Sequence, residues 1–344
     1  MKRIGLIAYS NNSGLGTIAF NFRKHLPISS QFIIKHPIKG THDINIPYTF
    51  GDIETTEVQL LRYLDKCSPE IVIIIETPFN FKFFKLLHDR GIKIILIPMI
   101  DSIGVKKFIP YEEYIDLVIN FTNIGHKIYT DQWNKKHIYL PYPIDTGYFK
   151  PSKILPKFTF THSAGWGGAH YRKATDLVFT AFRQLQYIDK TMSTLYLHGQ
   201  PGENKYSLYN KNISTTLCIK DFKEAKDIYT KGKIYVAPSR REGLGLPILE
   251  AMSCGLPVIT TNAPPMNEWF PVDYPLLINT IEQATLKYGD NLMYTPNTYN
   301  LLEKMRFAQN NMEEMVKLGQ TNRAIIQNNY SWKILRSKYM EYLK

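Results

Sequence analysis

The segment 240–262 constrains what this chain can fold into more than any other part of the sequence. It carries glycine and proline where a loop, a helix and a tight turn require them, at Gly243, Gly245, Pro247 and Gly255. Proline fits the start of a helix, where its missing N–H costs nothing, and glycine fits just past the end, where φ is positive. The apolar run 257–261 that follows predicts a buried strand. Loop, helix, turn and strand in this order form a unit of a parallel α/β sheet.

Two glutamates, Glu242 and Glu250, bracket the glycine-rich turn and the first turns of the predicted helix. The glycines let backbone N–H groups approach a ligand, and the amino end of a helix favours an anion. Glu250 lies one turn into the helix, where its two oxygens can accept hydrogen bonds from a pair of adjacent hydroxyls. Glu242 is expected on the other side of the same anion. An anion flanked by two polyhydroxyl groups is the outline of a nucleotide sugar.

These residues resemble the donor-site signature of the retaining GT-B glycosyltransferases, specifically glycosyltransferase family 4 (glycosyl transferases group 1). The chain meets the family pattern at Glu242, Gly243, Gly245, Glu250, Ala251, Met252, Gly255, Pro257, Val258 and Ile259. The resemblance implies that Glu250 binds the ribose diol and that Glu242 faces the transferred sugar as a catalytic residue. It also implies that the loop backbone holds sugar and phosphate oxygens, at Gly243, Leu244, Gly245 and Leu246. The alternative is a capped helix with two solvated glutamates and no ligand.

Short β-branched runs alternate with helical patterns along the chain, which is typical of parallel α/β sheets. In the first half we expect strands at 3–9, 31–35, 71–76, 94–98 and 117–121, and helices at 17–26, 57–67, 80–90 and 125–133. In the second half we expect strands at 158–162, 194–198, 216–220 and 233–237, before the strand of the signature. Helices are expected there at 174–187, 222–231, 300–327 with a break near Gly319, and 332–343.

A proline-containing connector, 139–151, predicts a stiff crossing between two domains. A chain of 344 residues suits two domains that each bury a core. We therefore expect an acceptor-side domain at 1–150 and a nucleotide-sugar donor domain at 151–326. The resemblance implies two Rossmann-like domains facing each other across a cleft. It also implies that the C-terminal segment 327–344 contains a helix that returns to the N-terminal domain.

Two further motifs bear on a donor site. Gly14 and Gly16 follow the first strand in a Gly-x-Gly-x-x-Ala pattern, a weak dinucleotide fingerprint. Because the second strand ends in Lys35 and His36 instead of an acidic residue, a nicotinamide-dependent enzyme is disfavoured. In the resembling family a glycine-rich loop here closes over the donor phosphates. The alternative is a helix-opening turn without a ligand.

The second motif is the basic pair Arg172–Lys173. Lys173 matches the family lysine that neutralises the diphosphate, whereas Trp166 stands where the family has an arginine and Ala174 replaces a glycine. Arg172 is therefore the candidate for the second positive charge. The alternative is that both are solvated residues at the start of a helix. Asp101, after the strand at 94–98, replaces a family histidine as a catalytic candidate, with a turn-forming aspartate as its alternative.

No metal or other cofactor is expected. The chain contains no Asp-x-Asp pair, which single-domain glycosyltransferases use to hold a divalent ion. In the two-domain class, positive side chains and a helix dipole do the same job. The cysteines Cys67, Cys218 and Cys254 are widely spaced, so neither a disulfide framework nor a zinc site is indicated.

Charge and hydropathy limit partners and location. The chain has 42 Lys and Arg against 30 Asp and Glu, a net charge of +12, with the larger excess after residue 150. A basic surface can attract anionic lipid headgroups or nucleic acid, and no run of like charge is long enough to choose between them. No apolar run reaches membrane-spanning length, and the N-terminus lacks the pattern of a signal peptide. We therefore expect a cytoplasmic protein, with peripheral contact at a membrane surface compatible with the charge.

The resemblance implies a retaining glycosyltransferase that moves a sugar from a UDP- or GDP-sugar to a hydroxyl of a glycan, lipid-linked or other acceptor. Two alternatives remain open at this point. The missing arginine and histidine allow a nucleotide-sugar-binding protein without activity. The basic composition and an aromatic-basic cluster allow a nucleic-acid-modifying glycosyltransferase, since bases stack on aromatic rings beside lysines. That cluster comprises Phe79, Phe81, Lys82, Phe83, Phe84 and Lys85, for which helix core is the other interpretation.

Overall fold

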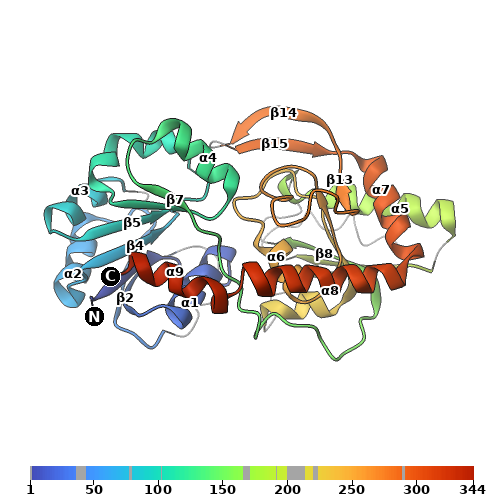
Figure 1. Ribbon diagram of the computed structural model, residues 1–344, viewed down its shortest axis with the longest axis horizontal. Helices are drawn as coiled ribbons and strands as arrows, with labels where there is room; N and C mark the ends of the chain where they lie inside the picture. Colours follow the sequence, from blue (N-terminus) through green and yellow to red (C-terminus); the bar gives the residue numbers. More distant parts are fainter. Residues whose placement is uncertain are drawn as a thin grey trace. The chain divides into compact units, whose positions relative to one another are not determined.

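The computed structural model describes residues 2–35, 44–76, 80–101, 103–165, 171–190, 192–199, 214–219, 224–288 and 291–344. The chain forms two compact units (Figure 1). Unit 1 comprises Met1–Pro143, Tyr288–Asn291 and Trp332–Lys344; unit 2 comprises Ile144–Lys287 and Leu292–Ser331. The division at Pro143 lies inside the proline-containing connector, earlier than the expected junction near Lys150.

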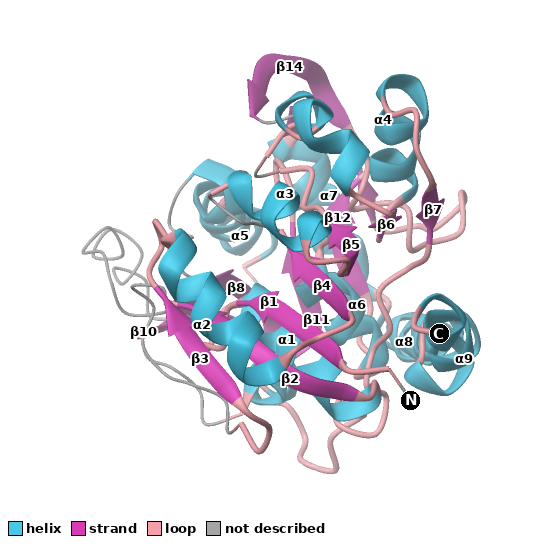
Figure 2. Cartoon of the chain, turned by 90° about the vertical axis from the view of Figure 1, so that its left-hand side faces the viewer, coloured by secondary structure: helices cyan, strands magenta, loops and turns pink. Residues whose placement is uncertain are grey.

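Unit 1 is built on a seven-stranded parallel sheet in the order β3-β2-β1-β4-β5-β6-β7. The strands are β1 Ile4–Ala8, β2 Ile28–Ile34, β3 Tyr48–Gly51, β4 Ile71–Ile75, β5 Lys93–Ile97, β6 Leu117–Asn120 and β7 His137–Tyr139. Figure 2 shows β3, β2, β1, β4 and β5 side by side in this order. Strands β2 and β3 are added on one side of β1, and β4 to β7 are added on the other. This change of side is the doubly wound arrangement.

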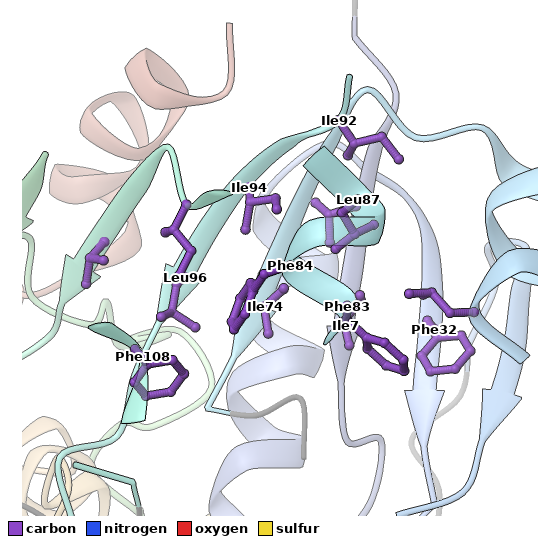
Figure 3. Close-up of a cluster of buried hydrophobic side chains, with 14 of the residues drawn as sticks. Ile7, Phe32, Ile74, Phe83, Phe84, Leu87, Ile92, Ile94, Leu96 and Phe108 are labelled. Atoms are coloured by element: carbon purple, nitrogen blue, oxygen red, sulfur yellow. The ribbon is translucent and has the colours of Figure 1, made fainter. Parts of the chain in front are cut away.

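One face of this sheet is covered by three helices, α2 Glu57–Cys67, α3 Lys82–Asp89 and α4 Asn123–Gln132, and by the 3-10 helices η1 Val105–Lys107 and η2 Ile109–Tyr114. Their apolar side chains pack on alternate residues of the strands, such as Ile7 and Ile74, to form the core in Figure 3. Phe83 and Phe84 belong to this core and are fully buried. These two rings are therefore not available to stack on bases, and the interpretation as helix core is the correct one for them. Phe79 lies outside the described residues.

The other face of the unit 1 sheet carries α1 Gly14–His25 and α9 Trp332–Tyr342. The ring of Trp332 meets Phe22 edge to face at 5.8 Å, and Tyr339 does so at 5.6 Å. The Tyr339 hydroxyl also donates to the carbonyl of Pro141 at 3.0 Å. The C-terminal helix α9 thus packs on the other elements of unit 1.

Unit 2 is built on a six-stranded parallel sheet in the order β10-β9-β8-β11-β12-β13. The strands are β8 Phe158–Gly165, β9 Leu195–Gly199, β10 Thr215–Ile219, β11 Gly232–Ala237, β12 Val258–Thr261 and β13 Leu277–Ile278. The helices are η3 Tyr171–Lys173, α5 Thr175–Asp189, η5 Ala225–Thr230, α6 Leu246–Ser253, α7 Thr298–Asn310 and α8 Met312–Asn329. A separate two-stranded sheet pairs β14 Thr280–Tyr288 with β15 Asn291–Pro296. The predicted α/β fold with two parallel-sheet domains is confirmed.

Some predicted elements differ from the structure. The break expected near Gly319 is wrong, because α8 continues through Gly319 and the helical stretch is interrupted at Asn311 instead. Gly319 serves close packing: a Cβ at this position would lie 2.1 Å from the carbonyl oxygen of Gly255. The helix expected at 222–231 is the short 3-10 helix η5, and residues 222–223 lie outside the described part of the chain. Within the described residues, no helix is both long and apolar enough to span a membrane.

Candidate functional site

The signature segment folds as its glycines and proline predicted. Gly245 has a φ of 76° and ends the loop after β11, and α6 then begins with Leu246 and Pro247. Gly255, with a φ of 77°, ends the same helix and turns the chain into β12. Both backbone positions favour glycine, because a residue with a Cβ is strained at such φ values.

Glu242 is buried between two cations. Its carboxylate accepts hydrogen bonds from Lys173 Nζ at 2.5 Å, Arg172 Nη1 at 3.1 Å and Ser239 Oγ at 2.6 Å. Only 5% of Glu242 is exposed. Burial alone raises the pKa of this carboxyl, but the charges of Lys173 and Arg172 outweigh it and lower the pKa to about 2. Glu242 is therefore ionised at every physiological pH.

The basic pair reaches Glu242 because of the strand order. Arg172 and Lys173 form the end of η3, after β8, and Glu242 follows β11, which is the neighbour of β8 in the sheet. Ala174 has a φ of 52°, in the left-handed region, where the resembling family has a glycine. Lys173 is buried and Arg172 is one-third exposed, so the interpretation of both as solvated helix-start residues is wrong for Lys173. Trp166 lies outside the described residues.

Two further contacts hold this region in place. Arg240 donates to both carboxylate oxygens of Asp176, at 3.1 and 3.0 Å, which fixes the loop before Glu242 to α5. His162 joins its Nδ1 to the carbonyl of Val236 at 2.7 Å and its Nε2 to Thr175 Oγ1 at 2.9 Å. Burial lowers the pKa of His162 to about 4, so the ring is neutral, donates from Nδ1 and accepts at Nε2.

Glu250 lies one turn into α6 and is also buried, with 6% exposed. The hydroxyl of Tyr229, from η5, donates to its Oε2 at 2.5 Å. Burial raises the pKa of Glu250 to about 8, although the Tyr229 hydrogen bond and the charge of Lys173 act in the opposite direction. Neither signature glutamate is solvated, so the interpretation as a capped helix with two solvated glutamates is wrong.

A further polar group lies beside the glycine-rich loop. The indole Nε1 of Trp269 is buried without a hydrogen-bond partner among the described residues. It lies 3.6 Å from the place that a Cβ on Gly245 would take. A buried unpaired donor is costly, and a ligand oxygen at the loop would satisfy it. Among the described residues, no group of His, Cys, Asp or Glu is placed to hold a metal ion.

The remaining candidates belong to unit 1. Gly14 begins α1, and the N–H of Gly16 donates to its N-cap Ser13 at 3.2 Å. A Cβ on Gly16 would lie 2.0 Å from the carbonyl oxygen of Asn11, so close packing requires a glycine here whether or not a ligand binds. Asp101 lies in the turn after β5 and is half-buried. The structure therefore brings together Arg172, Lys173, Glu242 and the loop to Glu250, and it leaves the roles of Gly14, Gly16 and Asp101 untested.

Residues 162–280 match the family model described as Glycosyl transferases group 1, and this range contains the whole cluster. Over these residues the chain is similar to the glycosyl transferases group 1 domain. O-antigen biosynthesis glycosyltransferase WclY from Escherichia coli is 27% identical over 173 residues, which cover 49% of this chain and 42% of that protein. The chain thus matches less than half of the length of this curated relative.

Solved structures share the fold over the full chain. A sucrose-phosphate synthase from Thermosynechococcus elongatus superposes with a TM-score of 0.73 at 15% identity, covering 100% of this chain and 98% of that one. Anabaena Alr3699/HepE, solved with UDP and glucose, superposes with a TM-score of 0.72 at 12% identity, covering 100% and 99%. At this identity the likeness to both structures shows the fold alone.

Proposed function

We propose that the chain transfers a sugar from a UDP- or GDP-sugar to a hydroxyl group, with retention at the anomeric carbon. The observation that carries the proposal is the buried cluster of Lys173, Arg172 and Glu242 beside the amino end of α6. The match to the group 1 family model over the same residues supports it. So does the shared fold with Alr3699/HepE, which was solved with UDP and glucose.

The two cations and α6 suit the diphosphate of such a donor. When the bond between the sugar and the diphosphate breaks, negative charge develops on the leaving oxygen and must be stabilised by fixed donors. Lys173 and Arg172 supply positive charge, and the amino end of α6 adds its dipole. The unpaired indole N–H of Trp269 is one more donor beside the glycine-rich loop.

Glu242 suits the sugar side of the reaction. The C1–O bond to the diphosphate breaks, positive charge develops on the ring, and the acceptor oxygen bonds to C1 on the same face. An ionised carboxylate at Glu242 orients sugar hydroxyls and places negative charge near the ring. The acceptor proton passes to the departing phosphate, so no separate general base is needed. The catalytic role of Asp101 and the donor contacts of Gly14 and Gly16 stay predictions.

Glu250 suits the ribose of the nucleotide. A carboxyl that keeps its proton donates from one oxygen and accepts at the other, so it can hydrogen-bond both hydroxyls of a diol, and Tyr229 already fixes one of its oxygens. For the acceptor we propose a saccharide hydroxyl, free or lipid-linked, because the relative WclY is named for O-antigen biosynthesis.

The experiment is a thermal-shift panel of UDP- and GDP-sugars followed by turnover assays. A bound donor should raise Tm, because ligand binding stabilises by RT ln(1 + [L]/Kd). The Lys173→Ala variant is the control and should lose the shift. If no nucleotide sugar raises Tm, the proposal is wrong. If a nucleotide sugar raises Tm but the turnover assays detect neither transfer nor hydrolysis, the chain is a nucleotide-sugar-binding protein instead.

We further propose that the reaction needs no divalent metal, because cations and a helix dipole surround the diphosphate position. Turnover should then survive EDTA. Loss of turnover in EDTA that Mg²⁺ or Mn²⁺ restores would contradict the metal-free mechanism without affecting the assignment of the donor.

A further inference from the structure

An exposed apolar pair lies in the loop that leads into β8. We call residues 150–157 the lysine-rich loop; its sequence is Lys-Pro-Ser-Lys-Ile-Leu-Pro-Lys. Ile154 is 73% exposed and Leu155 is 87% exposed. The lysines Lys150, Lys153 and Lys157 are exposed beside them. Figure 1 shows this segment, in green, looping away from the strands before it enters β8.

The base of the lysine-rich loop is fixed, so the apolar pair is not part of a fraying end. Phe149, just before it, is buried, and its carbonyl accepts hydrogen bonds from Ser253 Oγ at 2.7 Å and Arg323 Nη1 at 3.2 Å. On the other side, the N–H of Phe158 donates to the carbonyl of Lys231 at 3.0 Å. Within the loop, Ser152 Oγ accepts from the N–H of Ile154 at 3.0 Å. This anchored loop presents Ile154 and Leu155 to solvent.

Along the chain, the charge on both sides of the apolar pair has one sign. Between Asp145 and Asp176 the sequence contains no acidic residue. The side chain of Asp145 is held by the backbone, because its Oδ1 accepts hydrogen bonds from the N–H groups of Gly147 and Tyr148, each at 3.1 Å. Two largely solvated aliphatic side chains between lysines are the composition of an interfacial anchor, which combines apolar insertion with attraction to anionic headgroups.

We infer that the lysine-rich loop docks unit 2 on an anionic lipid surface. Ile154 and Leu155 insert below the headgroups, and the three lysines contact the lipid phosphates. Nucleic acid would use the charge but not the apolar pair, because single strands are held by stacking on aromatic rings and this loop has none.

The position of the lysine-rich loop leaves the candidate donor site open. The loop precedes the amino end of β8, whereas Arg172 and Lys173 follow its carboxyl end. Because the strands of the unit 2 sheet are parallel, Glu242 lies at the same carboxyl edge. Lipid contact at the opposite edge therefore does not compete with a nucleotide for the buried cluster, and substitutions in the loop should leave donor binding unchanged.

The test is co-sedimentation of the full chain with phosphatidylcholine vesicles that do or do not contain phosphatidylglycerol. The wild type should bind only the anionic vesicles, and salt should weaken binding. Each lysine contributes about 1 kcal/mol near such a surface, on the order of fivefold in partitioning. The triple variant Lys150→Gln/Lys153→Gln/Lys157→Gln should therefore lose roughly a hundredfold. The double variant Ile154→Ser/Leu155→Ser should also lose binding.

Two matched controls distinguish an effect of this loop from the general effect of positive charge or of exposed apolar side chains. Lys317→Gln/Lys333→Gln/Lys338→Gln removes the same charge from exposed lysines elsewhere, and Val272→Ser removes another fully exposed aliphatic side chain. Both controls should bind nearly as the wild type does, and all variants should keep its Tm. Absence of wild-type binding to anionic vesicles, or an equal loss in the control triple variant, would overturn the inference. So would self-association in sedimentation equilibrium that the double variant abolishes, because the loop would then bind a second copy.

Discussion

Lys173 donates a hydrogen bond of 2.5 Å to Glu242, so the residue expected to hold the diphosphate is already paired with the residue expected to face the sugar. Arg172 joins the same carboxylate at 3.1 Å. Without a nucleotide, Glu242 therefore neutralises the charges that a diphosphate would meet. A donor that binds here must share or displace this carboxylate, and the predictions below follow from that competition.

The first prediction concerns Glu242→Gln. The change should lower kcat, because the negative charge near the developing oxocarbenium ion is lost. It should also leave two cations without a counter-charge, so the free energy of unfolding should fall by roughly 1.5–3 kcal/mol, the range for hydrogen bonds to charged groups. Free UDP or GDP should bind more tightly than to the wild type and restore much of the lost stability. Calorimetry and thermal unfolding with and without the nucleotide check this.

The matched control is Glu313→Gln, which removes an exposed carboxylate from the first turn of α8. It should change neither kcat nor nucleotide affinity. If Glu242→Gln binds UDP and GDP no better than the wild type does, the carboxylate does not compete with the diphosphate.

The second prediction compares the two cations. Lys173→Ala should weaken binding of UDP or GDP by roughly 1.5–3 kcal/mol, as expected for a hydrogen bond to a charged group. Arg172→Ala should weaken it less, because Arg172 is one-third exposed and its charge is partly screened by water. Isothermal titration of both variants measures the difference. A larger loss for Arg172→Ala would transfer the main phosphate contact to the arginine.

How far the sequence predicts this fold can be judged from single elements. The helix expected at 57–67 has the observed bounds of α2, because Thr56 and Gln59 form a reciprocal capping box that marks its start. Strands β3 and β7 were not predicted. Tyr48 and Phe50 of β3 are exposed, and β7 has three half-buried residues, so neither strand shows a buried apolar run. Edge strands of this kind are recognised only from their partners in the sheet.

The sequence predicted which residues form the loop and helix of the candidate site, but it did not predict which side chains pair with one another there. Glycine, proline and glutamate spacing located the loop and α6, because those positions depend on local backbone geometry. The pairing of Lys173 with Glu242 depends on β8 and β11 being neighbours, which local patterns do not specify. Tyr229 was missed because it belongs to η5, far from Glu250 in local sequence pattern, and meets that carboxyl only through the fold.

The third prediction is a pH dependence that Glu250 imposes. Its pKa is raised from 4.5 to about 8 by burial, so between these values the folded state keeps a proton that the unfolded state loses. The free energy of unfolding should therefore fall as pH rises through this window, by up to about 1.4 kcal/mol per pH unit. His162 acts in the opposite sense, but only between its lowered pKa of about 4 and its ordinary 6.5. Denaturant unfolding between pH 6.5 and 8 thus isolates Glu250.

Glu250→Gln has no proton to lose and should abolish this slope. If the variant retains the wild-type slope between pH 6.5 and 8, another group causes it and Glu250 is ionised throughout. In turnover assays the same variant should mainly raise the donor KM, because the ribose contact is equal in ground and transition states.

The last prediction assigns Tyr229 a positioning role for the ribose contact. Tyr229→Phe removes the hydroxyl that donates to Glu250 and leaves the ring packed against Phe149 and Tyr235. UDP affinity should fall by about 1 kcal/mol, the ordinary contribution of one hydrogen bond, whereas affinity for 2′,3′-dideoxy-UDP should not change. Tyr274→Phe is the control, because its buried hydroxyl binds Asn322 and the N–H of Val258 instead of the site. That variant should lose stability without changing the preference for ribose. An equal loss of affinity for both nucleotides in Tyr229→Phe would mean that the tyrosine supports packing alone and that Glu250 binds the diol without it.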